Sequence, residues 1–168
     1  RARYPNIMRR VSGYNLDEFL TDDPFNMARM VVGSEGTLCV VTEAKLNLVT
    51  RPTMTALSVL HFTGIVQSSE AIVEVLKHAP SSIEVMDKIL LERSRESVGH
   101  SGDMSFIEGD PGALLAVEFY GESEAELSAK LNALKDDMEA KHLGYACVNL
   151  LDRAGQSSVW NLRKAGLG

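Results

Sequence analysis

The sequence predicts an α+β fold, built as a ferredoxin-like sandwich and preceded by a segment of different character. From Met54 onward, strand-like and helix-like patterns follow the order β-α-β-(α)-β-α-β-α. Two βαβ units in series are typical of the ferredoxin-like sandwich, in which helices cover one face of the sheet. We therefore expect the other face to be free to pack against another part of a larger protein. Arg51-Pro52 separates the two segments, because a residue before proline is biased away from helix.

The segment before this boundary contains one helix signal, one glycine-rich loop and one long strand signal. Asp23-Pro24 is typical of a helix N-cap followed by the first helical residue, and it predicts a short helix through Met30. The loop Gly33-Ser34-Glu35-Gly36-Thr37 follows. Residues 38–49 are rich in Val, Thr and Leu, and they predict a long strand.

Four strands and four helices are expected after the boundary. The strand patterns cover residues 56–62, 83–86, 113–120 and 145–151. Ser68 is the expected cap of the first helix, which Pro80 closes, while Asp87 and Asp152 are the expected caps of the second and the last. The longest helix pattern spans 122–143, with Gly144 as its closing residue. Its apolar stripe predicts the core-facing side: Leu127, Leu131, Leu134 and Met138.

Composition excludes several classes of protein. The chain has 168 residues, of which 45% are hydrophobic and 24% charged, so it can build a core without disulfide or metal support. No window approaches the roughly 18 consecutive apolar residues of a membrane-spanning helix. The net charge of −6 argues against a general nucleic-acid or anionic-membrane binder. Both ends of the chain are typical of cuts through a longer protein, and we expect a fragment.

The cysteines and histidines form no ligand pattern. Cys39 and Cys147 lie far apart and outside any CxxC pair, so we expect both to be small buried hydrophobes; a reducing cytoplasm fits this thiol usage but is not required by it. The histidines share no metal-ligand spacing, and a structural or solvated role is expected for each: His61, His78, His100 and His142. The first ten residues are basic. Packing against another part of a longer protein is favoured over phosphate binding for their arginines, Arg1, Arg3, Arg9 and Arg10.

The glycine loop has two interpretations. Glycines allow close backbone approach or positive φ, and exposed N–H groups with hydroxyls bind phosphate oxygens or ring carbonyls. The spacing matches neither GxGxxG nor a P-loop. On the residues alone, a plain turn is the simpler interpretation.

A resemblance to a known family favours the ligand-binding interpretation. Three runs together resemble the FAD-linked oxidases of the vanillyl-alcohol-oxidase type: RYPNIMRR (3–10), GYNL (13–16) and MVVGSEGTLCVVTEA (30–44). This family includes D-lactate, glycolate and D-2-hydroxyglutarate dehydrogenases. SIEVMD (82–87) resembles the start of its substrate (cap) domain, and FIEGDPGA (106–113) with VEFYG (117–121) resembles the large bacterial members fused to an iron–sulfur region.

The resemblance implies a domain organisation and a cofactor site. Residues 1–52 would be the end of the FAD-binding domain, and residues 53–168 a truncated cap domain of the FAD-linked oxidase C-terminal type. The positions expected to contact FAD, largely through backbone, are Gly33, Ser34, Glu35, Gly36, Thr37, Leu38 and Val40. Cys39 stands where the family usually has glycine, so its bulk would crowd the cofactor.

The resemblance also implies a substrate-binding residue. WNLR (160–163) resembles the family's W-x-L-R helix, whose arginine binds the carboxylate of a 2-hydroxy acid. Arg163 suits that role, because a guanidinium meets a carboxylate through two parallel hydrogen bonds. A surface arginine near a helix end is the alternative. Leu167 stands where some relatives carry a hydroxyl. For Glu84 and Asp87, a helix cap at Asp87 is favoured over acid–base catalysis by the pair.

The implied function is the oxidation of a D-2-hydroxy acid, D-lactate or D-2-hydroxyglutarate, by hydride transfer to FAD. Electrons would then pass to an iron–sulfur centre or another acceptor. We expect the [4Fe-4S] cysteines and a divalent-metal motif to lie beyond Gly168, so this chain alone would be inactive and hold no stable FAD. The expected location is the cytoplasm, or the periphery of the inner membrane. The alternative is a non-catalytic ferredoxin-like module for binding or dimerisation. The sequence does not decide whether the protein forms a homo-oligomer.

Overall fold

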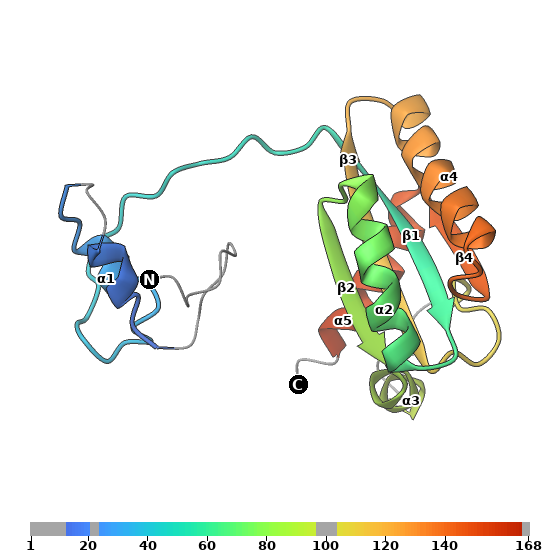
Figure 1. Cartoon of the computed structure of the whole chain (residues 1–168), viewed down its shortest axis with the longest axis horizontal. Coiled ribbons are helices and arrows are strands. Elements are labelled where there is room, and N and C mark those ends of the chain that lie inside the picture. Colours follow the sequence, from blue (N-terminus) through green and yellow to red (C-terminus); the bar gives the residue numbers. More distant parts are fainter. Residues whose placement is uncertain (1–12, 21–23, 97–103, 166–168) are drawn as a thin grey trace. The chain divides into compact units, whose positions relative to one another are not determined.

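The computed structural model describes residues 13–20, 24–96 and 104–165. The chain divides into two compact units, Arg1–Val49 and Thr50–Gly168 (Figure 1). The basic residues of the first ten positions, His100 and Leu167 lie outside the described residues. Among the residues that are described, no helix combines the length and the apolar character needed to cross a membrane.

The second unit is built on a four-stranded antiparallel sheet. Its strands are β1 (Met54–Phe62), β2 (Ser82–Asp87), β3 (Ala113–Gly121) and β4 (Ala146–Leu150). Their order in the sheet is β2-β3-β1-β4, with every neighbouring pair antiparallel. This arrangement of a β-α-β-β-α-β chain is the ferredoxin-like one, so the predicted α+β fold is confirmed.

Helices α2 (Ile65–Val75) and α4 (Glu124–Ala140) cover one face of the sheet (Figure 1). Successive strand residues point to opposite faces, so alternate residues of β1 and β3 supply this layer of the core. The predicted stripe of α4 is fully buried against them. The side chains of this layer include Leu60, Phe62, Val75, Leu115, Phe119, Leu127, Leu131, Leu134 and Met138.

The opposite face is also covered, so the expectation of a free face is wrong. Helices α3 (Lys88–Glu96) and α5 (Arg153–Ala165) pack there and bury a second core layer. Its members include Leu57, Val59, Met86, Leu91, Phe106, Leu114, Val159 and Leu162. The physical reason is that α3 and α5 each carry apolar side chains on one side, and burying them requires the face that α2 and α4 leave open.

Two of the predicted helix caps are confirmed and one is wrong. The side chain of Asp87 accepts a hydrogen bond from the Leu90 N–H at 2.9 Å, and Asp152 accepts one from the Gly155 N–H at 2.7 Å. Helix α2, however, begins at Ile65 rather than at Ser68. The Ser68 hydroxyl lies inside the first turn and donates to the Ile65 carbonyl at 2.8 Å.

The end of α4 also differs from the prediction. The helix stops at Ala140, and His142 rather than Gly144 takes the first left-handed position, with φ of 55°. The Leu143 N–H then donates back to the Met138 carbonyl at 2.9 Å, which closes the helix as a Schellman motif does. Gly144 has a different role, because a Cβ there would lie 2.8 Å from the His61 carbonyl oxygen.

The first unit contains little regular structure. A 3-10 helix, η1 (Leu16–Phe19), precedes the short helix α1 (Ala28–Val31). Helix α1 begins four residues after Pro24, and the Asn26 side chain accepts the Ala28 N–H at 3.0 Å; Asp23 lies outside the described residues.

The predicted strand over residues 38–49 is wrong, because no residue of this segment is in a strand and none pairs with another strand in the part of the chain that the structure describes. Their apolar side chains stay in solvent, and Val40, Leu48 and Val49 are each at least 90% exposed. Strand propensity alone makes no strand, since a strand forms only where neighbouring backbone accepts and donates its hydrogen bonds.

Candidate functional site

The glycine loop turns through three left-handed residues within four positions. Gly33, Glu35 and Gly36 have φ values of 85°, 51° and 74°. Glycine adopts such angles without strain, which explains why the loop needs two of them. A Cβ built on Gly36 would meet no atom within 4 Å, so the outer side of the loop is open space.

Side-chain hydrogen bonds join this loop to the earlier Gly13–Leu16 motif. The Tyr14 hydroxyl lies 2.8 Å from the Thr37 hydroxyl, and the Asn15 amide donates to the Val32 carbonyl at 3.0 Å. Thr37 in turn donates from its hydroxyl to the Ser34 carbonyl. The two motifs that carry the family resemblance in this unit are therefore one local structure.

The residues expected to contact FAD differ in what they can offer. Ser34 is 4% exposed, and its backbone N–H and carbonyl both serve the turn. Within residues 13–20 and 24–96, the N–H groups of Glu35, Gly36 and Leu38 donate to no protein acceptor. Leu38 and Val40 are exposed beyond the loop. An open turn with spare backbone donors fits a cofactor held through main-chain contacts.

The cysteines have different environments. Cys39 is exposed, so the expectation that it is a buried hydrophobe is wrong. Cys147 lies against the core layer under α4, and burial raises the pKa of its thiol to about 11. A thiol with so high a pKa stays protonated near neutral pH and is a poor nucleophile.

Arg163 lies in the last turn of α5 and forms an ion pair with Glu84 of β2. Its Nε donates to Glu84 Oε2 at 3.1 Å. The alternation of side chains along β2 explains why Glu84 can contact Arg163, because Glu84 and Met86 point to the face of the sheet that α5 covers. The two side chains keep 32% and 37% of their surface exposed, so the pair sits at the margin of the core.

The terminal nitrogens of Arg163 have no hydrogen-bond partner among the residues that the structure describes. A guanidinium has five N–H donors, and the Glu84 contact engages only the Nε side. The group can therefore still receive a carboxylate from solvent. Asp87, by contrast, caps α3, and its one side-chain hydrogen bond among the described residues is with the Leu90 N–H.

The Glu84–Arg163 contact is a feature that the sequence did not predict. The two residues are 79 positions apart, and only the covered second face of the sheet brings α5 over β2. The SIEVMD and WNLR motifs each resemble the family on their own residues, and no local pattern in either one indicates the other as its partner.

Two of the described histidines, His61 and His78, have structural partners for their side chains. His61 is fully buried, its Nδ1 lies 3.1 Å from the Val59 carbonyl, and its Nε2 accepts the Glu108 N–H. Burial lowers the pKa of His61, because the charged imidazolium is poorly solvated there. His78 pairs with Asp137 at 3.0 Å. Over residues 13–20, 24–96 and 104–165, no three His, Cys, Asp or Glu side chains gather into a possible metal site.

The chain is similar in sequence to a known protein family and to several named enzymes. Residues 51–168 match the family described as FAD linked oxidases, C-terminal domain. A D-2-hydroxyglutarate dehydrogenase of Pseudomonas putida is 29% identical over 175 residues, and one of Escherichia coli is 27% identical over 178 residues. Each alignment covers 98% of this chain and 17% of the relative.

A D-lactate dehydrogenase of Anaerostipes hadrus is 26% identical over 110 residues, which is 64% of this chain and 23% of that protein. The chain thus spans about one sixth of the length of the D-2-hydroxyglutarate dehydrogenases that it matches.

Proposed function

Because the chain belongs to the FAD-linked oxidases, we propose that it is part of a flavin-dependent dehydrogenase that oxidises a D-2-hydroxy acid. Similarity to proteins named D-2-hydroxyglutarate dehydrogenase extends over 98% of the chain, whereas the similar D-lactate dehydrogenase covers 64%. D-2-hydroxyglutarate is therefore the favoured substrate, and D-lactate is the second.

In this proposal the first unit contributes to the cofactor site. The residues that would hold FAD are Gly33, Glu35, Gly36, Thr37, Leu38 and Val40, in a turn to which Ser34 also belongs, and the spare N–H groups of Glu35, Gly36 and Leu38 support that role. FAD, when bound, accepts the hydride of the substrate carbon. The buried side chain of Ser34 means that this residue would shape the turn rather than reach the cofactor.

Arg163 would bind and orient the substrate carboxylate in the second unit. The observation that carries this role is its guanidinium, fixed at Nε by Glu84 and open at its terminal nitrogens. A guanidinium held by one carboxylate is pre-organised, so less side-chain freedom is lost when a second carboxylate binds. Glu84 would then act as the positioning residue of Arg163.

Three further parts of the proposal concern the longer protein. Electrons would leave toward an iron–sulfur centre or another acceptor, a divalent metal would be held outside this chain, and the protein would act in the cytoplasm or at the periphery of the inner membrane. We also expect this chain by itself to be colourless and inactive. A yellow, flavin-loaded preparation of residues 1–168 would contradict that expectation.

Turnover by the full-length protein tests the proposed function. The assay supplies D-2-hydroxyglutarate, D-lactate or their L enantiomers with a dye as electron acceptor. We expect turnover of the D acids, highest with D-2-hydroxyglutarate. Equal turnover of both enantiomers would contradict a site that orients the carboxylate, and no turnover of any 2-hydroxy acid would favour a non-catalytic binding or dimerisation module.

A further inference from the structure

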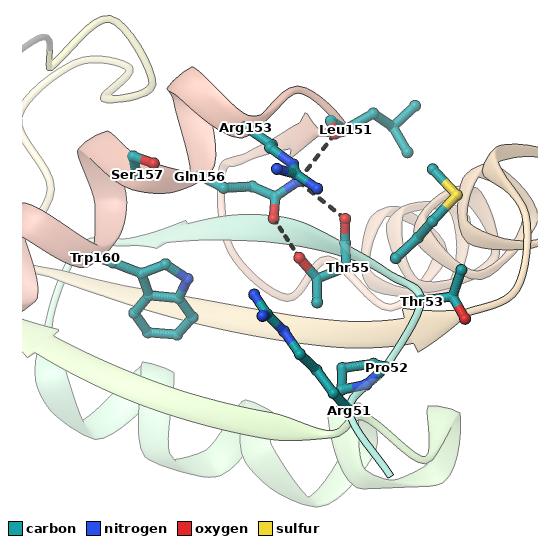
Figure 2. A pocket seen from close by; sticks show the side chains of 10 residues that line it. Arg51, Pro52, Thr53, Thr55, Leu151, Arg153, Gln156, Ser157 and Trp160 are labelled. Atoms are coloured by element: carbon teal, nitrogen blue, oxygen red, sulfur yellow. Dashed lines mark hydrogen bonds between the residues drawn. The ribbon is translucent and has the colours of Figure 1, made fainter.

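A cavity of about 710 Å³ lies at the start of β1, beside the first half of α5 (Figure 2). The segment before β1 forms one wall, and α5 with the end of β4 forms the other. Its lining residues are Arg51, Pro52, Thr53, Met54, Thr55, Leu151, Arg153, Gln156, Ser157 and Trp160. The volume falls within the range of about 300–1,000 Å³ that small-molecule sites occupy.

The charge of this cavity is opposite to that of the chain. The whole sequence carries 23 acidic against 17 basic residues, yet the lining holds two arginines and no carboxylate. Figure 2 shows the side chains of Arg51 and Arg153 extending toward the same space. Within the described part of the chain, neither guanidinium forms an ion pair or a hydrogen bond.

The wall behind the arginines is fixed by hydrogen bonds. Gln156 is only 6% exposed, and its amide is fully engaged. Its oxygen accepts the Thr55 hydroxyl at 2.7 Å, and its nitrogen donates to the Thr55 and Leu151 carbonyls at 3.0 and 2.9 Å. The cavity floor therefore joins α5 to β1 and the end of β4. Trp160 adds an aromatic surface and an indole N–H donor.

This cavity is separate from the carboxylate site proposed at Arg163. Arg153 and Arg163 are ten residues apart on α5, which corresponds to about 15 Å along a helix that rises 1.5 Å per residue. Arg163 is also absent from the lining of the cavity.

We propose that this cavity binds a small anion through the guanidinium groups of Arg51 and Arg153. The anion carries a phosphate or a carboxylate group, since guanidinium offers both of them paired, parallel hydrogen bonds. The Trp160 indole supplies the adjacent surface for an apolar or flat part of such a molecule. The site does not depend on the proposed dehydrogenase activity, because it uses different residues.

Trp160 is the only tryptophan of the chain, so its fluorescence reports on the cavity directly. The 168-residue chain is titrated with inorganic phosphate and, separately, with succinate. Sodium chloride at matched ionic strength is the control for screening. We expect a saturable fluorescence change with at least one of the two anions. Saturation with phosphate alone, or with succinate alone and unchanged in Arg163→Gln, supports the proposal and identifies the group that is recognised.

Matched variants then assign the binding to the cavity. Arg51→Gln and Arg153→Gln are each expected to weaken binding by about tenfold or more, because each removes charge-assisted hydrogen bonds. Arg93→Gln, an exposed arginine of α3 outside the lining, removes the same charge and should leave affinity unchanged. Arg163→Gln should also leave it unchanged, which separates this site from the proposed substrate site. Circular dichroism checks that each variant is folded. If Arg153→Gln does not fold, Arg153→Lys replaces it, because lysine keeps the charge but lacks the paired donors of the guanidinium.

Two results would overturn the proposal. One is a fluorescence change that sodium chloride reproduces or that Arg51→Gln and Arg153→Gln leave intact. The other is the absence of a saturable signal with both anions, together with the absence of binding heat when phosphate and succinate are titrated calorimetrically.

Discussion

Arg163 of α5 donates from its Nε to Oε2 of Glu84, which lies on the edge strand β2, at a distance of 3.1 Å. Both side chains remain about one-third exposed, so solvent screens their attraction and the pair adds little to the free energy of folding. Its effect is on geometry, because the carboxylate fixes the direction in which the remaining guanidinium nitrogens face. A positioning role therefore predicts more loss of substrate binding than of stability when Glu84 is changed.

The substitution Glu84→Gln tests that role. We expect the free energy of unfolding to change by less than about 1 kcal/mol, as for other exposed ion pairs. In the full-length protein, KM for the 2-hydroxy acid should rise several-fold while kcat changes little, since only the orientation of the binding group is loosened. Glu92→Gln, which alters an exposed carboxylate of α3, is the matched control. An unchanged KM in Glu84→Gln would leave the pair with a structural role alone.

The core layer under α4 predicts a large loss of stability when it is opened. Leu131 is 1% exposed and packs between the helix and the sheet. Leu131→Ala should lower the free energy of unfolding by about 2–5 kcal/mol, through lost burial and the cavity that remains. Denaturant unfolding measures the change. Val73→Ala, at a residue that is 64% exposed, should stay within about 0.5 kcal/mol of the parent chain.

The buried His61 predicts that stability falls in mild acid. Burial lowers the pKa of His61 in the folded chain, so the unfolded chain takes up a proton first as the pH falls below about 6.5. The stabilisation is complete above that pH and is lost as the pH falls toward the lowered folded-state pKa. A protonated Nε2 would also no longer accept the Glu108 N–H.

Melting temperatures between pH 8 and pH 5 measure this effect, with His61→Gln as the comparison. Glutamine keeps an acceptor for the Glu108 N–H but does not titrate, so its loss of stability over that range should be smaller. An identical acid dependence in both proteins would assign the effect to other groups.

Removal of residues 1–49 tests the independence of the second unit. All four strands and both core layers belong to residues 50–168, so the shortened chain should keep a cooperative unfolding transition. It should also aggregate less, because the deletion removes exposed apolar side chains such as Leu46 and Leu48. Thermal unfolding and light scattering check both expectations. Loss of the cooperative transition would show that the first unit is needed for folding.

The sequence predicted the elements whose residues carry their own signal. β3 begins with an unbroken apolar run, Ala113–Val117, that is buried on both faces, and the stripe of α4 has helical spacing, so the sequence predicts both elements to within a few residues. Asp87 and Asp152 were also found, because a cap acts on residues only three positions away.

The misses concern long-range packing. The covering of the second face depends on how α5 packs back onto the sheet beside α3. The Glu84–Arg163 pair forms only because of that packing. The residues over 38–49 have strand composition, but pairing is decided by neighbouring strands rather than by the segment itself. Arg51 and Arg153, at the cavity beside Trp160, carry no local signature at all.

The most direct test of the central claim is the rate of flavin reduction by D-2-hydroxyglutarate in the full-length protein, measured without oxygen for Arg163→Ala and Arg163→Lys. We predict that Arg163→Ala lowers kcat/KM by about a hundredfold or more, and that lysine rescues only part of it because it lacks the paired donors. Arg93→Ala, a remote arginine of α3, should behave like the unmodified protein. Flavin reduction in Arg163→Ala at the unmodified rate and KM would contradict the claim that this guanidinium holds the substrate.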